Sequence, residues 1–147
     1  MDTTIDLRLC ADCHCLAARR RARELTRLFD EHLRPHGLRA TQFSVLAVLA
    51  LSGGATVNRL ADALGVERTT LSRSTAILER RGWIKSDTSS DARVRPLSLT
   101  ESGRQKLESA YPAWKAAQDA AAAQLRDPAL TPATPQPQGS VRQKARK

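Results

Sequence analysis

Residues 56–85 read TVNRLADALGVERTTLSRSTAILERRGWIK, and this stretch decides the fold. Thr56 can cap a short helix over 57–64, because its hydroxyl can accept a hydrogen bond from an amide of the first turn. Gly65 can take a positive φ and so allows a tight turn into a second helix over 67–81. A small residue, a turn residue and an apolar anchor stand in order as Ala61, Gly65 and Leu71. Two helices that cross steeply need residues of these three kinds at their contact, in their turn and on the second helix. The stretch therefore predicts a helix-turn-helix.

A short hairpin is expected directly after these helices. Gly82 can end the second helix as a left-handed residue. Residues 83–85 and 96–99 are typical of strands, and the polar residues 86–95 join them. The predicted fold class is therefore mainly α with a small β-hairpin wing, a winged helix-turn-helix. This assembly recurs among DNA-binding proteins.

Long helices flank this unit on both sides. Apolar residues recur at steps of three and four over 16–33, which predicts an amphipathic helix that Pro35 and Gly37 end. A helix that is apolar nearly all round follows, with Thr41 as its expected cap. After the hairpin, Thr100 can cap a last long helix, and Pro112 is expected to bend it.

The second helix of the helix-turn-helix has a polar face. If Leu71 points inward, a step of ~100° per residue turns Thr75 and Leu78 inward as well. The outer face and the first turn hold the candidate DNA contacts Arg68, Thr69, Thr70, Ser72 and Arg73. Amides of the first turn favour phosphate, and Arg73 can offer a bidentate fork to a guanine edge. The alternative is a solvated helix face that binds nothing.

The loop of the hairpin returns through two arginines. Asp91 can hold Arg93 by a charge-assisted hydrogen bond and so orient it toward a narrow minor groove. Arg95 adds a second cation. The alternative is a local surface ion pair with little effect.

The sequence resembles the MarR family over residues 16–125. The most specific match is LERRGWI at 78–84, followed by Asp91-x-Arg93 and by LSLTESG at 97–103. The resemblance implies a homodimer that binds a pseudo-palindromic operator, with 66–81 in the major groove and Arg93 in the minor groove. It also implies repression, often relieved by a small molecule or an oxidant.

We expect the chain to have four parts. They are an N-terminal dimerisation helix with a cysteine cluster (1–37), the winged helix-turn-helix (38–100), a C-terminal dimerisation helix (101–126) and a disordered, basic, proline-rich tail (127–147). The family usually has a further dimerisation helix where this tail stands. The dimer is therefore expected to rest on the first and last long helices.

Composition favours a polyanionic partner. The chain of 147 residues has 24 Lys and Arg against 15 Asp and Glu, a formal net charge of +9. Such a balance attracts phosphate backbones or anionic lipid surfaces. No apolar run approaches the ~20 residues that cross a bilayer, and the N-terminus has no secretory pattern. We expect a cytoplasmic protein that does not enter the membrane.

Three cysteines lie close together before the first long helix. Cys10, Cys13 and Cys15, with His14, could bind Cu(I) or Zn²⁺ as an effector, or the thiols could act as a redox sensor. The alternative is that they are small apolar residues in the dimer interface. No cofactor is expected to be required.

An enzyme is not expected, because no nucleophile, base and orienting group stand at a recognisable spacing and no Gly-rich phosphate loop is present. Two other classes stay open. One is a thiol-redox or metal-carrier protein that uses the cysteine cluster, and the other is a winged helix that binds protein. Sequence-specific DNA binding would distinguish the regulator from both.

Overall fold

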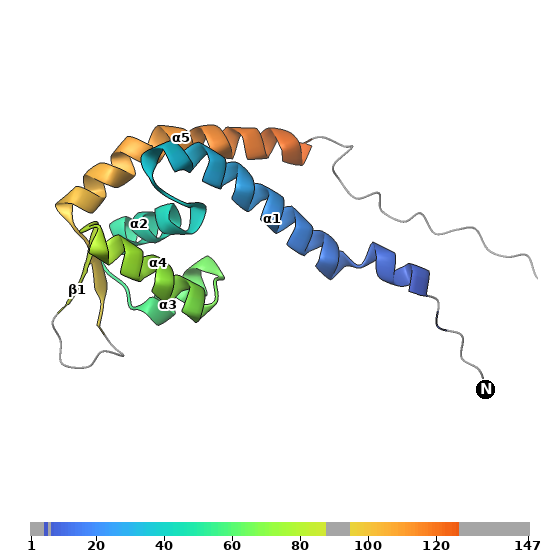
Figure 1. Cartoon of the computed structure of the whole chain (residues 1–147), viewed down its shortest axis with the longest axis horizontal. Coiled ribbons are helices and arrows are strands. Elements are labelled where there is room, and N and C mark those ends of the chain that lie inside the picture. The colour runs from blue at the N-terminus through green and yellow to red at the C-terminus, as the bar shows by residue number, and fades with distance from the viewer. Residues whose placement is uncertain (1–4, 6, 88–94, 127–147) are drawn as a thin grey trace, which may run out of the picture.

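The structure is a computed structural model that describes residue 5 and residues 7–87 and 95–126 (Figure 1). Its elements are η1 (Leu7–Asp12), α1 (His14–Leu33), η2 (Arg34–His36), α2 (Ala40–Ser52), α3 (Val57–Leu64), α4 (Arg68–Arg80), β1 (Ile84–Ser86), β2 (Leu97–Leu99) and α5 (Glu101–Arg126), where η marks a 3-10 helix. The predicted fold class, mainly α with a two-stranded hairpin, is confirmed. The predicted tail from residue 127 lies outside the described residues.

Helix α2 is central to the core, as its apolar composition predicts. It packs against α1, α3, α4, α5 and β2. Its Val45, Leu46 and Leu49 are buried, together with Leu60 of α3 and Leu71 of α4. In Figure 1 the α2–α4 unit and the hairpin lie beneath the first part of α5, while α1 extends away from them.

The predicted helix-turn-helix is present. The Thr56 hydroxyl accepts a hydrogen bond from the Arg59 amide at 3.3 Å and so caps α3. Gly65 has a φ of 60°, which allows the turn into α4. Leu71, Thr75 and Leu78 are the buried residues of α4, which confirms the predicted inner face.

The start of α2 differs from the prediction. Thr41 does not cap it, because it lies within the helix, which begins at Ala40 with Arg39 in the N-cap position. The Ala40 amide donates to the carboxylate of Asp30 on α1 at 2.7 Å, and the Arg39 amide donates to the side chain of Gln42 at 3.0 Å. Asp30 reaches this position only because α1 and α2 pack together.

The strands begin one residue later than predicted. They are antiparallel, with Ile84 opposite Leu99 and Ser86 opposite Leu97. Trp83 precedes β1, since its amide donates to the carbonyl of Leu78 and so closes the end of α4. Thr100 caps α5 as predicted, because its hydroxyl accepts from the Gly103 amide at 3.0 Å.

The long helices α1 and α5 pack against each other near the α1–α2 connection. Pro112 lies within α5, and Figure 1 shows this helix arched, as the proline predicts. Ala110, Ala117 and Ala121 of α5 are buried, whereas Leu125 is 59% exposed. No helix within the described ranges has the length and apolar character needed to span a membrane.

Candidate nucleic-acid interface

Helix α4 separates a buried face from an exposed polar face. All five predicted contacts on this helix are exposed, and they are Arg68, Thr69, Thr70, Ser72 and Arg73. The separation follows from the spacing of Leu71, Thr75 and Leu78, whose burial in the core turns the residues between them outward. The helix therefore offers hydroxyl and guanidinium groups to a partner along one side.

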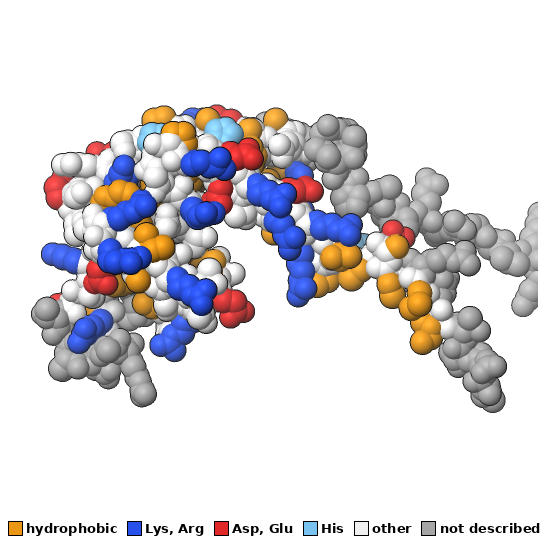
Figure 2. Space-filling view, viewed as in Figure 1, with side chains coloured by type: hydrophobic (Ala, Val, Ile, Leu, Met, Phe, Trp, Pro, Cys, Tyr) orange, Lys and Arg blue, Asp and Glu red, His pale blue; other side chains and the backbone are white. Residues whose placement is uncertain are grey.

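The charge of this face is mainly positive. Glu79 is occupied by the hairpin, because its carboxylate accepts hydrogen bonds from both the amide and the hydroxyl of Ser86. Figure 2 shows Lys and Arg side chains gathered over α4 and along α1. This distribution suits a phosphate backbone.

Acidic groups at the start of α4 limit the predicted phosphate contact there. Glu67 precedes the first turn of the helix. It lines a hollow of about 410 Å³ together with Asp62, Arg68 and residues of α3. Two carboxylates at this end oppose the attraction of the helix dipole for an anion. Arg68 is thus the cationic group of a site that also holds carboxylates, which differs from the purely cationic site predicted from the sequence.

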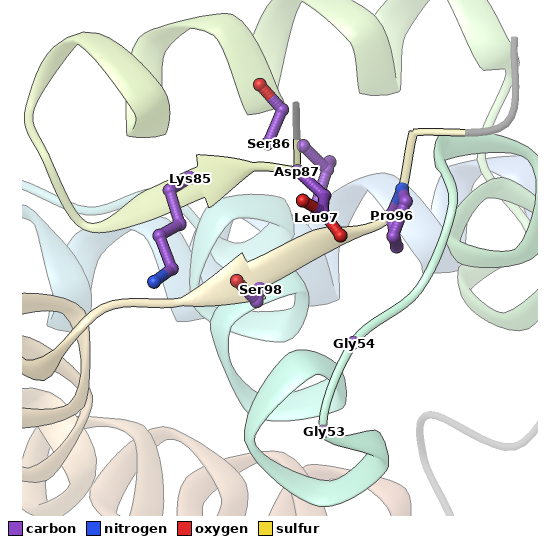
Figure 3. A pocket seen from close by; sticks show the side chains of 8 residues that line it. All are labelled: Gly53, Gly54, Lys85, Ser86, Asp87, Pro96, Leu97 and Ser98. Carbon is purple, nitrogen blue, oxygen red and sulfur yellow. The ribbon is translucent and has the colours of Figure 1, made fainter. Parts of the chain in front are cut away.

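The hairpin contributes a second set of polar groups. Lys85 and Ser98 lie opposite each other in the strand register, and both line a hollow of about 480 Å³ at the base of the hairpin (Figure 3). Lys85 is exposed because the neighbouring Ile84 is buried and side chains alternate along a strand. Lys85 is not among the contacts predicted from the sequence, although a basic residue in a strand of the wing was a usable signal.

The predicted contacts in the hairpin loop are only partly described. Asp91 and Arg93 lie outside the described residues. Arg95 is described and exposed, at the return of the loop. Their roles therefore stay predictions.

The cysteines lie near the N-terminus, at the start of α1. Cys10, Cys13 and Cys15 are free and exposed, so the protomer alone does not bury them as apolar filler. Cys13 is the residue before α1, which begins at His14. Within the part of the chain that the structure describes, no three His, Cys, Asp or Glu side chains form a group able to hold a metal. The four predicted ligands are thus not gathered into a site here.

Comparisons with known proteins agree with this fold. A family model described as the MarR family matches residues 36–93. The transcriptional regulator MosR of M. tuberculosis, in a crystal structure with DNA, is 42% identical with a TM-score of 0.68, covering 78% of this chain and 84% of that chain. MarR of E. coli, in the apo form, is 22% identical with a TM-score of 0.63, covering 76% of this chain and 84% of that one.

One curated relative also matches. It is the uncharacterized HTH-type transcriptional regulator YwoH of Bacillus subtilis, 33% identical over 87 residues, or 59% of this chain. The match spans 64% of the length of that relative. The similarity to this relative thus covers only part of either protein.

Proposed function

This chain belongs to the MarR family, and on that premise we propose that it is a transcriptional regulator that binds double-stranded DNA as a homodimer. The observation that carries the proposal is the two-faced α4, which buries its apolar residues and exposes its hydroxyl and guanidinium groups beside a hairpin. The crystal structure of MosR with DNA, at 42% identity, supports the same partner.

Within this proposal α4 lies in the major groove. Arg73 donates two hydrogen bonds to a guanine edge, while Thr69 and Ser72 contact neighbouring bases or phosphates. Arg68 and Thr70, in the first turn, contact the backbone. Phosphate contacts fix the register of the protein and base contacts specify the sequence.

The hairpin lies against the flanking minor groove. Asp91 orients Arg93 toward this groove. Arg95 and Lys85 neutralise phosphates between the minor groove and the major groove that α4 occupies. Lys85 is assigned a phosphate contact because it is exposed on β1, between α4 and the loop of the hairpin.

The homodimer rests on α1 and α5. Apolar side chains of these helices are left open in the protomer, with Leu16 42%, Tyr111 51% and Leu125 59% exposed. A second copy of the chain can cover them, which removes apolar surface from water. Two recognition helices related by a two-fold axis then require half-sites about one helical turn, ~34 Å, apart. Such a pseudo-palindromic operator is the site of repression.

We propose that the cysteines supply the regulatory input. They are exposed, and they lie at the start of α1, a helix of the proposed interface: Cys10 is in η1, Cys13 is the residue before α1, and Cys15 is in its first turn. Peroxide can oxidise two of these thiols to a disulfide, with release of two water molecules, and Cu(I) or Zn²⁺ can displace the thiol protons. Either reaction changes how α1 enters the interface and hence the separation of the two α4 helices.

Selection from random DNA tests the function. We expect the full chain to enrich a pseudo-palindromic duplex and to bind it as a dimer, with an affinity that falls steeply as salt rises. Sedimentation and fluorescence anisotropy at several salt concentrations measure both. A protein that remains monomeric, or that enriches no sequence, would contradict the proposal.

A further inference from the structure

Trp83 is in contact with two cationic side chains at the junction of α4, the hairpin and α5. The guanidinium carbon of Arg81 is 5.0 Å from the centroid of the Trp83 ring, and the ammonium of Lys106 is 4.9 Å from it. Both distances are within the range of cation–π attraction. We name these three residues the Trp83 clamp.

The same two cations also hold the connection between α1 and α2. The guanidinium of Arg81 donates to the carbonyl of Gly37, and the ammonium of Lys106 donates to the carbonyl of His36 at 3.3 Å. These carbonyls belong to consecutive residues at the end of η2. The clamp therefore joins three segments that are far apart in the sequence: the end of α4, the start of α5 and η2.

The backbone beneath the clamp leaves no room for sliding. The Thr100 amide donates to the carbonyl of Trp83 at 3.1 Å, and the Thr100 hydroxyl donates to the carbonyl of Gly82 at 2.6 Å. A Cβ at Gly103 would lie 1.9 Å from the Trp83 carbonyl oxygen, so α5 passes as close as a glycine permits. The first turn of α5 is thus packed directly on the residues that follow α4.

Neither cation of the clamp has an ion-pair partner among the described residues. They contact one aromatic ring and two backbone carbonyls, which are more restricted in position than a flexible carboxylate side chain. An interaction with flexible carboxylates would leave more freedom. These contacts therefore fix the orientation of α4 relative to α5 and η2.

We propose that Arg81 and Lys106 are positioning residues for DNA binding, which fasten the recognition helix α4 to α5 and η2 so that these elements move as one body. The proposal rests on the proposed function. A displacement of the dimerisation helices then moves α4 by the same amount. Bending occurs in the part of α5 beyond Lys106, where Pro112 removes a backbone hydrogen bond.

The consequence is a narrow tolerance for half-site spacing. One base pair added at the centre of an operator moves the half-sites by ~3.4 Å and rotates them by roughly 35°. A rigid pair of recognition helices cannot follow both changes, whereas a loosened pair can. Spacing preference therefore reports the clamp, while overall stability does not.

The test compares Lys106→Met with Lys115→Met, a matched control on the same helix. Lys115 is exposed, and its ammonium pairs with Asp119 on the surface of α5, at 2.9 Å. The probes are the duplex that the wild-type protein selects from random DNA and two derivatives, one base pair longer and one shorter at the centre. The measured quantity is the ratio of the affinity for the selected duplex to the affinity for each derivative. We expect this ratio to be the same for the wild type, Lys115→Met and Lys106→Arg. In Lys106→Met the ratio should fall about five- to tenfold.

Hydrogen exchange provides a second readout without DNA. The amides of Trp83 and Thr100 should exchange faster in Lys106→Met than in the control. Unchanged spacing preference in a folded Lys106→Met dimer would overturn the proposal and leave the proposed function standing. If the wild type selects no DNA, both fail. Should Lys106→Met not fold by circular dichroism, Arg81→Met removes the other cation and is judged by the same criteria.

Discussion

At the scale of the residue, burial on one side of α4 determines which groups are available on the other. Leu71, Thr75 and Leu78 are buried, so Arg73 is held outward by packing rather than by a contact of its own. An arginine held in this way is free to form a bidentate contact, since its guanidinium has no ion-pair partner among the residues that the structure describes.

Replacing Arg73 by alanine should cost about 1–3 kcal/mol of binding free energy on the selected duplex and relax the preference at one base position. Anisotropy titrations of the duplex and its single-base variants at fixed salt measure this. Arg104→Ala, an exposed arginine on α5, is the matched control. An equal loss on every sequence would mean that Arg73 contacts phosphate instead of a base.

Gly103 is required by close approach and not by an unusual φ. Its missing side chain makes room for the Trp83 carbonyl, at 1.9 Å from an ideal Cβ. Gly103→Ala should therefore lower the free energy of unfolding by about 1–3 kcal/mol, because the backbones must separate. Urea unfolding followed by circular dichroism measures it, with the exposed neighbour Ser102→Ala as control. Equal midpoints for the two variants would show that α5 can shift at no cost.

At the scale of the element, α1 has apolar side chains that the packing of one protomer leaves exposed, and three thiols lie at its start. Of its residues only Leu33 is buried, although the apolar spacing extends over 16–33. The packing of one protomer therefore uses the end of the helix and leaves the rest open. This is the physical basis for placing both the dimer contact and the regulatory input on α1.

The variant Cys10→Ser, Cys13→Ser, Cys15→Ser should bind the selected duplex as the wild type does under reducing conditions. On treatment with peroxide, Cu(I) or Zn²⁺, the wild type should lose affinity and the variant should not, because only thiols can be oxidised or metallated at these positions. Anisotropy before and after treatment, with thiol titration, measures the change. An identical response of the two proteins would assign the cysteines a structural role.

At the scale of the whole molecule, positive charge is spread beyond the recognition helix. The C-terminal residues 128–147 include the four cations Arg142, Lys144, Arg146 and Lys147. Such a segment can neutralise phosphates without reading bases. It should therefore add to the salt-dependent part of the affinity alone.

Deleting residues 128–147 should leave the fold and the dimer intact and flatten the dependence of log affinity on log salt by at most about 0.9 per lost phosphate contact. Sedimentation and salt titrations on the selected duplex and on an unrelated one check this. The reduction should be the same for both duplexes. Loss of the dimer on deletion would instead assign this segment to the interface.

The sequence by itself determined the features that depend on near neighbours in the chain. Thr56 and Thr100 cap helices whose amides lie three residues on, and Gly65 and Gly82 allow turns because their own φ is positive. The inner face of α4 follows from helical periodicity. The winged helix-turn-helix and the outward position of Arg73 could thus be predicted.

Only the tertiary structure decided the features that join distant segments. Asp30 caps α2 across a turn between helices, and Lys106 meets the carbonyl of His36 from a different helix. No local sequence pattern predicts such long-range contacts, because the packing of whole helices decides which residues meet. The open side of α1 has the same origin: periodicity marks a residue as apolar, but the position of the other helices decides whether the protomer or a second copy covers it.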